Sequence, residues 1–405
     1  MLEAAGTPLH LPRYDRTDRP LSAYVHVPFC RVRCGYCDFN TYSAQFGLGA
    51  DLASYHQTLI EEIAKSAQML SEAGYPQRQL QTVFFGGGTP TMLPSKHLVE
   101  ILTALRNSHG IAPGAEVTVE ANPDTVTPQL MEQLAAGGFT RVSMGMQSAV
   151  PHVLATLDRT HTPSRVPQAV EAAKAAGLQV SVDLIYGTPG ESIGDWQTSL
   201  DAALGMEPDH ISAYSLIVEP GTKMYRQIER GQLPQPSDDE QAEKYEIADA
   251  TLAASGYAWY EISNWERSDQ PTTPGTYPGP RASQHNLAYW RDWDWWGYGP
   301  GAHSHVANTR WWTLKHPTAH ASAVREGYRI AGSEQLGEDE RTLERVMLGI
   351  RTREGIEASQ LTGNADELKC LASEGLIDES ALELGRVALT LRGRLLADLV
   401  TDRLT

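Results

Sequence analysis

The chain has 405 residues, 41% of them hydrophobic, and no residue type dominates, so a globular protein too large for one ordinary core is expected. Its 33 Lys and Arg residues against 50 Asp and Glu give a formal net charge of −17. That balance argues against a nucleic-acid-binding protein, which normally presents a basic surface. The sequence contains no apolar run of about 18 residues, so we expect no transmembrane helix.

The cysteines and the N-terminus indicate the compartment. Residues 1–20 lack the basic start and apolar core of a signal peptide, and we interpret them as a polar lead-in. Three of the four cysteines, Cys30, Cys34 and Cys37, stand close together, whereas a disulfide scaffold would spread them along the chain. Clustered cysteines without a secretion signal are typical of metal binding in a reducing compartment, so we expect a cytoplasmic protein.

Over residues 21–235, short apolar or β-branched runs alternate with helix-like segments. The predicted strands contain residues 24–27, 82–85, 117–120, 141–144, 180–185 and 210–214, and the predicted helices contain residues 51–70, 95–107, 127–136, 165–176 and 194–204. This alternation predicts an α/β fold with a parallel sheet. About six repeats without a dinucleotide-binding glycine fingerprint favour a partial (β/α)6 barrel, whose ligands are expected at the C-terminal ends of the strands.

The alternation stops after residue 235. A helix is predicted from its cap Ser237 to Ala254, followed by an aromatic-rich segment that a Pro/Gly-rich loop over residues 269–280 interrupts. We take residues 236–336 as an aromatic-rich extension of the barrel. Residues 337–405 are predicted to form a small helical, winged-helix-like C-terminal domain with a hairpin near Leu382 and Leu389. The acidic composition favours a packing role for it over DNA binding.

The three clustered cysteines follow the first predicted strand with C-x3-C-x2-C spacing. Three thiolates on one loop can each hold one iron of a 4Fe–4S cluster and leave the fourth iron open to a chelating ligand. The alternative is a structural zinc site, which normally takes four protein ligands. Cys370 lies far along the chain, and His26 is a candidate for the fourth ligand. We expect the iron–sulfur cluster.

The cysteine motif, followed by Asp38-Phe39-Asn40, resembles the signature of the radical-SAM superfamily. The stretch 23–30 is similar to the branch that contains oxygen-independent coproporphyrinogen III oxidase and the HemW-type heme chaperones. The resemblance covers about residues 22–310. It implies a radical-SAM barrel in which a 4Fe–4S cluster on Cys30, Cys34 and Cys37 binds S-adenosylmethionine (SAM) at its fourth iron and receives electrons from a donor.

The resemblance also implies SAM contacts at several strand ends. Gly87, Gly88 and Thr89, in a Gly-Gly-Gly-Thr-Pro element, match the residues that contact the methionine amino group, although such glycines also suit an ordinary tight turn. The remaining implied contacts are Tyr24, Tyr36, Glu120, Gln147, Arg159, Asp183 and Ile217. The fork of a guanidinium suits the carboxylate of the cofactor. Any one of these residues alone fits a capping or core role, but together they predict one cleft.

Two departures favour the chaperone branch over the oxidase. Phe39 stands where the oxidase carries an additional cysteine, and the oxidase has a longer N-terminal extension. The segment His285-Asn286-x-x-Tyr289-Trp290 is similar to the HNxxYW motif of the heme chaperones, which implies heme binding. A histidine can ligate heme iron, and tyrosine and tryptophan offer stacking surface.

Less specific interpretations of this region stay open. The aromatic residues of the segment can equally form a core or lid cluster with His285 hydrogen-bonded inside it. His303, in a Gly-rich stretch, is either a second heme ligand or a turn-stabilising side chain. Relatives often carry Cys-Arg before the His-Asn pair, where this chain has Ser283-Gln284.

The sequence therefore predicts a heme chaperone that carries a 4Fe–4S cluster and SAM. It would bind heme and transfer it to apo heme proteins, those of the respiratory chain included. Whether SAM is cleaved, and so whether the protein is an enzyme, stays open. The alternatives are an oxygen-independent coproporphyrinogen III oxidase, which decarboxylates propionate side chains, and a structural relative without a cluster.

Overall fold

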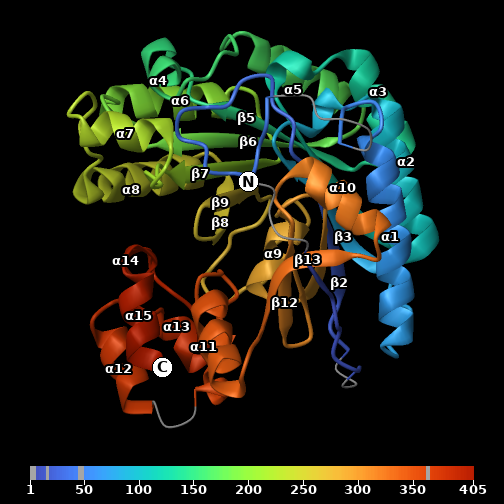
Figure 1. The fold of residues 1–405 in the computed structure, drawn as a ribbon. Coiled ribbons are helices and arrows are strands. Elements are labelled where there is room, and N and C mark those ends of the chain that lie inside the picture. The colour runs from blue at the N-terminus through green and yellow to red at the C-terminus, as the bar shows by residue number, and fades with distance from the viewer. Residues whose placement is uncertain (1–5, 15–17, 44–49, 362–364) are drawn as a thin grey trace.

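The computed structural model describes residues 6–14, 18–43, 50–361 and 365–405. Its centre is a curved sheet in which six parallel strands pair in chain order (Figure 1). These strands are β2 (Leu21–Val27), β3 (Leu80–Gly87), β4 (Ile111–Ala121), β5 (Arg141–Gln147), β6 (Gln179–Tyr186) and β7 (His210–Ser215). Each of them contains one of the six predicted runs, so the partial (β/α)6 barrel is confirmed.

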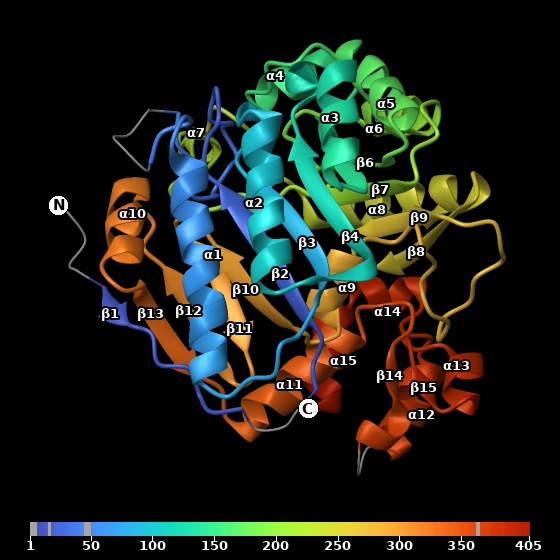
Figure 2. The same ribbon diagram turned by 90° about the vertical axis from the view of Figure 1, so that its right-hand side faces the viewer.

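Helices between these strands cover the outer face of the sheet (Figure 2). They are α1 (Tyr55–Glu72), α2 (Ser95–Ser108), α3 (Pro128–Gly137), α4 (Pro151–Thr156), α5 (Arg165–Ala175) and α6 (Ile193–Leu204), with 3-10 turns η1 (Pro90–Met92) and η2 (Pro123–Thr125). Amphipathic spacing explains their packing: α2 buries Leu98, Ile101, Leu102 and Leu105 on one face. Helix α3 ends at Gly138, which takes a left-handed φ of 101° that glycine adopts easily.

Two helices follow β7, before the aromatic-rich extension forms its first strand. They are α7 (Lys223–Glu229) and α8 (Asp238–Ala254). The hydroxyl of the predicted cap, Ser237, accepts a hydrogen bond from the backbone N–H of Glu240 at 3.4 Å. The sequence therefore located both ends of α8 correctly.

The aromatic-rich extension continues the barrel sheet at both edges, which the sequence did not reveal. Beside β2 lie β10 (Asp294–Tyr298), β11 (His303–Val306), β12 (Thr309–Thr313), β13 (Arg329–Gln335) and β1 (Thr7–Pro8); beside β7 lie β9 (Asn264–Arg267) and β8 (Tyr257–Glu261). Strand β10 pairs in parallel with β2, and the further strands are antiparallel. The predicted polar lead-in thus contributes a short strand of its own. Helices α9 (Gln284–Trp290) and α10 (Pro317–Arg325) belong to the same region.

Residues 337–405 have their own hydrophobic core. It is built by α11 (Glu338–Gly349), η3 (Ala358–Gln360), α12 (Ala365–Ser373), α13 (Glu379–Glu383), α14 (Leu391–Leu395), α15 (Ala397–Leu404) and a small sheet of β14 (Ile356–Glu357) and β15 (Arg386–Val387). The predicted hairpin near Leu382 and Leu389 is wrong: Leu382 is helical, and Leu389 pairs with Ile377 in an isolated bridge. The boundaries at residues 235 and 336 stay a prediction. No described helix combines the length and the apolar character that crossing a bilayer requires.

Candidate functional site

The cysteine loop begins where β2 ends and is held by backbone hydrogen bonds. Cys30 N–H donates to the carbonyl of Tyr42 at 3.0 Å, and Thr89 N–H, from the glycine turn after β3, donates to the carbonyl of Phe29 at 2.8 Å. A side chain at Gly88 would meet that same carbonyl at 2.6 Å and Cys30 Sγ at 3.0 Å. The glycine is therefore needed for the turn to lie directly against the cysteine loop.

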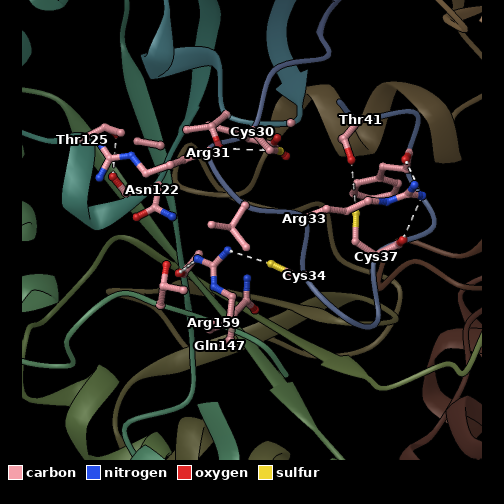
Figure 3. Close-up of a pocket in the computed structure, with 18 of the residues that line it drawn as sticks. Cys30, Arg31, Arg33, Cys34, Cys37, Thr41, Asn122, Thr125, Gln147 and Arg159 are labelled. Atoms are coloured by element: carbon pink, nitrogen blue, oxygen red, sulfur yellow. Dashed lines mark hydrogen bonds between the residues drawn. The ribbon is translucent and has the colours of Figure 1, made fainter. Parts of the chain in front are cut away.

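All three clustered cysteines are free thiols that line one pocket of about 180 Å³ (Figure 3). Burial raises the pKa of Cys30 to about 11 and raises that of Cys37 as well. A thiol must lose its proton to bind a metal, so the loop takes up metal with release of protons. The three thiols are the expected donor set for a cluster.

Arg159 and Gln147 face the cysteines from the opposite side of the pocket. Figure 3 shows the guanidinium of Arg159 directed at Cys34, with Nη1 at 3.7 Å from Sγ, while Nη2 donates to the carbonyl of Gly145 at 2.7 Å. Gln147 ends β5 with a positive φ of 64°, a strained value for a residue other than glycine. Its Oε1 and the Nε of Arg159 are buried without a hydrogen-bond partner in the described chain. Buried polar atoms are normally paired, so a ligand here would satisfy both.

Two carboxylates stand on neighbouring strands of the pocket. Glu120 accepts a hydrogen bond from Gly87 N–H at 3.0 Å. Asp183 accepts hydrogen bonds from the hydroxyls of Ser143, at 3.0 and 3.1 Å, and Ser212, at 2.8 Å. Burial raises the pKa of Asp183, and burial together with the charge of Asp183 raises the pKa of Glu120 to about 8. A cationic ligand group would favour the charged form of Glu120.

A larger cavity of about 420 Å³ continues from this pocket into the barrel. Tyr36, Glu120, Gln147 and Asp183 line both spaces, and Ile217, 68% exposed, lines the larger one. Sequence reasoning missed several pocket residues, namely Met92, Asn122, Asp124, Thr125, Ser143, Asp158, Thr160 and Ser212. Asn122 was the easiest to find, because it follows Glu120 by two residues at the same strand end.

Tyr24 is the predicted SAM contact that the structure places apart from these spaces. Its hydroxyl lies 3.1 Å from Nδ1 of His26, and its ring stacks on Phe84. The structure brings the other nine predicted SAM contacts to the pocket or the cavity. Nε2 of His26 in turn lies 2.9 Å from the carbonyl of Asn40. Because both ring nitrogens are engaged, His26 is not a fourth ligand beside the cysteines, which counts against the zinc alternative.

The raised pKa of Glu120 predicts a pH-dependent stability in cluster-free protein. Between its ordinary pKa and about 8, the folded state holds a proton that the unfolded state releases, so stability falls as the pH rises through this window. Glu120→Gln removes this term. We expect wild type to lose up to about 4 kcal/mol relative to Glu120→Gln between about pH 5 and pH 8, measured by urea unfolding. Glu132→Gln, on an exposed part of α3, should run parallel to wild type, and parallel curves for Glu120→Gln would contradict the prediction.

The predicted heme ligand His285 lies in a closed environment. It is 1% exposed on α9, Nδ1 lies 2.7 Å from the hydroxyl of Thr82, and Nε2 lies 2.9 Å from the hydroxyl of Tyr289. Neither nitrogen can reach an iron without breaking one of these contacts. Axial ligation by His285 stays a prediction that would require this arrangement to open, and the contacts of the ring agree with the alternative of a hydrogen-bonded histidine inside an aromatic cluster.

The other residues of the motif also make internal contacts. Asn286 and Trp290 hydrogen-bond the buried carboxyl of Glu261, whose pKa burial raises to about 7. Asn286 also lines the floor of the larger cavity. His303 begins β11 rather than lying in a turn, and its ring stacks on Trp312. The motif thus fixes α9 beneath the cavity.

The arrangement described so far combines a three-thiol loop, two carboxylates, a guanidinium and a half-buried glycine turn around one pocket. Thiolates suit iron of an iron–sulfur cluster, and the carboxylates and guanidinium suit the ammonium and carboxylate of an amino-acid moiety. The residues present therefore fit a 4Fe–4S cluster and SAM together.

Comparison with known proteins agrees with this chemistry. The family model described as the Radical SAM superfamily matches residues 24–203. The chain is 44% identical over 390 residues to the heme chaperone HemW of Mycobacterium tuberculosis, with 95% of each chain covered, and 32% identical to that of Bacillus subtilis, with 93% and 97% covered. Among solved structures, coproporphyrinogen III oxidase (HemN) from Escherichia coli, a radical SAM enzyme, is similar with a TM-score of 0.77 and 22% identity over 95% of this chain and 90% of that one. At this identity the likeness to the oxidase concerns the fold alone.

Proposed function

The chain belongs to the heme chaperone HemW family of the radical SAM superfamily, and from this premise we propose that it binds heme and transfers it to apo heme proteins. The observation that carries the proposal is the 44% identity to a heme chaperone over 95% of both chains. Heme proteins of the respiratory chain are among the proposed acceptors. A cytoplasmic location and an electron donor to the cluster are parts of the same proposal.

The family implies a 4Fe–4S cluster and SAM as resident cofactors. In this chain Cys30, Cys34 and Cys37 would hold the cluster, and the cluster would supply electrons at the metal-bound SAM. Glu120 is placed to accept from an ammonium, and Arg159 to pair with a carboxylate. The glycine turn, with Gly87, Gly88 and Thr89, lines the same pocket, and its glycines let it lie directly against His26 and the cysteine loop. Tyr36, Gln147, Asp183 and Ile217 are the proposed remaining contacts.

The first experiment is a heme titration of anaerobically reconstituted protein, followed by absorbance. We expect stoichiometric binding with a defined Soret band. Because both ring nitrogens of His285 are engaged inside the protein, His285→Ala is expected to keep the wild-type Soret position. His152→Ala is the matched control, since His152 is exposed on α4 and outside the aromatic-rich extension.

The outcomes separate the candidate functions. If the wild-type protein binds no heme but consumes SAM when it converts coproporphyrinogen III, the chaperone proposal is wrong and the oxidase alternative is right. A Soret band that shifts or disappears in His285→Ala alone would mean that α9 opens and exposes the motif when heme binds. Heme binding without porphyrinogen turnover supports the chaperone.

A further inference from the structure

A group of potential metal ligands lies between α1 and α2, outside the site described above. His56 stands in the first turn of α1, and His97 and Glu100 stand three residues apart on α2, so that both project from one face. The two helices pack side by side on the outer face of the sheet (Figure 2). One ligand atom from each of the three side chains lies within 4.8 Å of the others.

The spacing of the group suits a transition metal. His56 Nε2 lies 3.4 Å from Glu100 Oε2. Two ligands at about 2.1 Å from a tetrahedral ion stand about 3.4 Å apart, so this pair already has the required separation. The two imidazoles are stacked, with ring centroids 3.7 Å apart and planes at 16°. Lone pairs of parallel rings cannot meet at one point, so the less buried ring, that of His97, must turn when an ion binds.

The burial of the group also indicates a missing ligand. His56 is 8% exposed, and the Nδ1 atoms of both histidines are buried with no hydrogen-bond partner in the described chain. Buried polar side-chain atoms are normally paired, and an ion bound after the His97 ring turns would satisfy Nδ1 of that residue. Nδ1 of His56 lies across its ring from Nε2, which faces Glu100, and would not bind the same ion. The neighbouring cation, Lys96, lies 3.8 Å from the other oxygen of Glu100, but its side chain is 82% exposed and is free to move away.

We propose that His56, His97 and Glu100 bind a divalent transition-metal ion of the zinc class. Two histidines and one glutamate are a known zinc donor set, in which a water molecule takes the fourth position. The ion would join the starts of two helices: α1 follows the cysteine loop in the chain, and α2 follows the glycine turn and η1. It would thereby brace the two segments that line the cysteine pocket.

The test uses the cluster-reconstituted protein, because an empty cysteine loop would itself take up zinc. Titration calorimetry with Zn²⁺ is expected to give one site in wild type, weakened at least about 100-fold in His97→Ala and in Glu100→Gln. The matched control is His152→Ala: Nε2 of His152 also lies 3.4 Å from a carboxylate, that of Asp195, but no second histidine completes a ligand set among the described residues. This control should bind zinc as wild type does.

Two further measurements distinguish zinc binding at these three residues from misfolding of the variants and from zinc binding by cysteines. Thermal unfolding with a chelator present checks that each variant is folded, and added Zn²⁺ is expected to raise the Tm of wild type and of His152→Ala only. Titration with Co²⁺ should give a spectrum without the strong sulfur-to-cobalt absorption that cysteine ligands produce. The proposal is overturned if the reconstituted wild type takes up no zinc, if the variants bind it equally well, or if the cobalt spectrum indicates sulfur ligands.

Discussion

Cys34→Ser is expected to remove the 4Fe–4S cluster from the reconstituted protein. The three loop cysteines are the proposed protein ligands of the cluster, and a serine hydroxyl is a poor ligand for its iron. Cys34 also faces the guanidinium of Arg159, so the loss removes the thiolate that this cation would stabilise. We expect iron and sulfide contents and the visible cluster absorbance to fall by about tenfold or more, together with SAM binding, which needs the open iron.

Cys370→Ser is the matched control for this experiment. Cys370 is exposed on α12, and its thiol lies beside Glu374 and Arg403 rather than in the pocket. Its replacement should leave iron content and SAM binding at wild-type values. Unchanged iron content in Cys34→Ser would contradict the proposed ligand set and favour a structural relative without the cluster.

The parts of the fold that the sequence revealed are those with local signals. The six parallel strands are short apolar runs bounded by capped helices, and such runs mark buried strands wherever their partners lie. Most of the edge strands escaped because strands of only four or five residues carry a weak pattern. Strand β12 does alternate between buried and half-buried residues, but β10 pairs with β2, more than 250 residues earlier in the chain. No local sequence pattern identifies a partner strand this distant in the chain.

The same distinction applies to the candidate site. The cysteines, the glycine turn and the strand-end carboxylates were found because each stands at a recognisable spacing or strand end. The state of His285 could not be read in this way, since it depends on Thr82, a hydroxyl 203 residues away in sequence. Ser143 and Ser212 were missed for the same reason: their role is to hold Asp183, which only the register of three strands reveals.

Glu116→Gln is expected to destabilise the protein by about 3–5 kcal/mol, because it leaves a buried arginine without its counter-charge. Arg141, 1% exposed, has its Nε at 3.1 Å from Glu116 Oε2. The carboxylate of Glu116 also accepts the backbone N–H groups of Gln284 and His285, at 3.1 and 3.0 Å, in the first turn of α9. A negative charge there favours the helix start, so the substitution weakens the anchor of α9 as well. Urea unfolding of cluster-free protein measures the loss.

A double-mutant cycle with Arg141→Met distinguishes the ion pair from simple loss of packing. If the pair is the cause, the double variant should be less destabilised than the sum of the single variants, because no uncompensated charge remains. The exposed pair of Asp366 and Lys369 is the control, and Asp366→Asn there should cost less than about 1 kcal/mol. An additive cycle at Glu116 and Arg141 would contradict the argument. Asn286 on α9 lines the larger cavity. The ion pair of Glu116 and Arg141 therefore also helps to hold the proposed ligand site in place, because Glu116 anchors the first turn of α9.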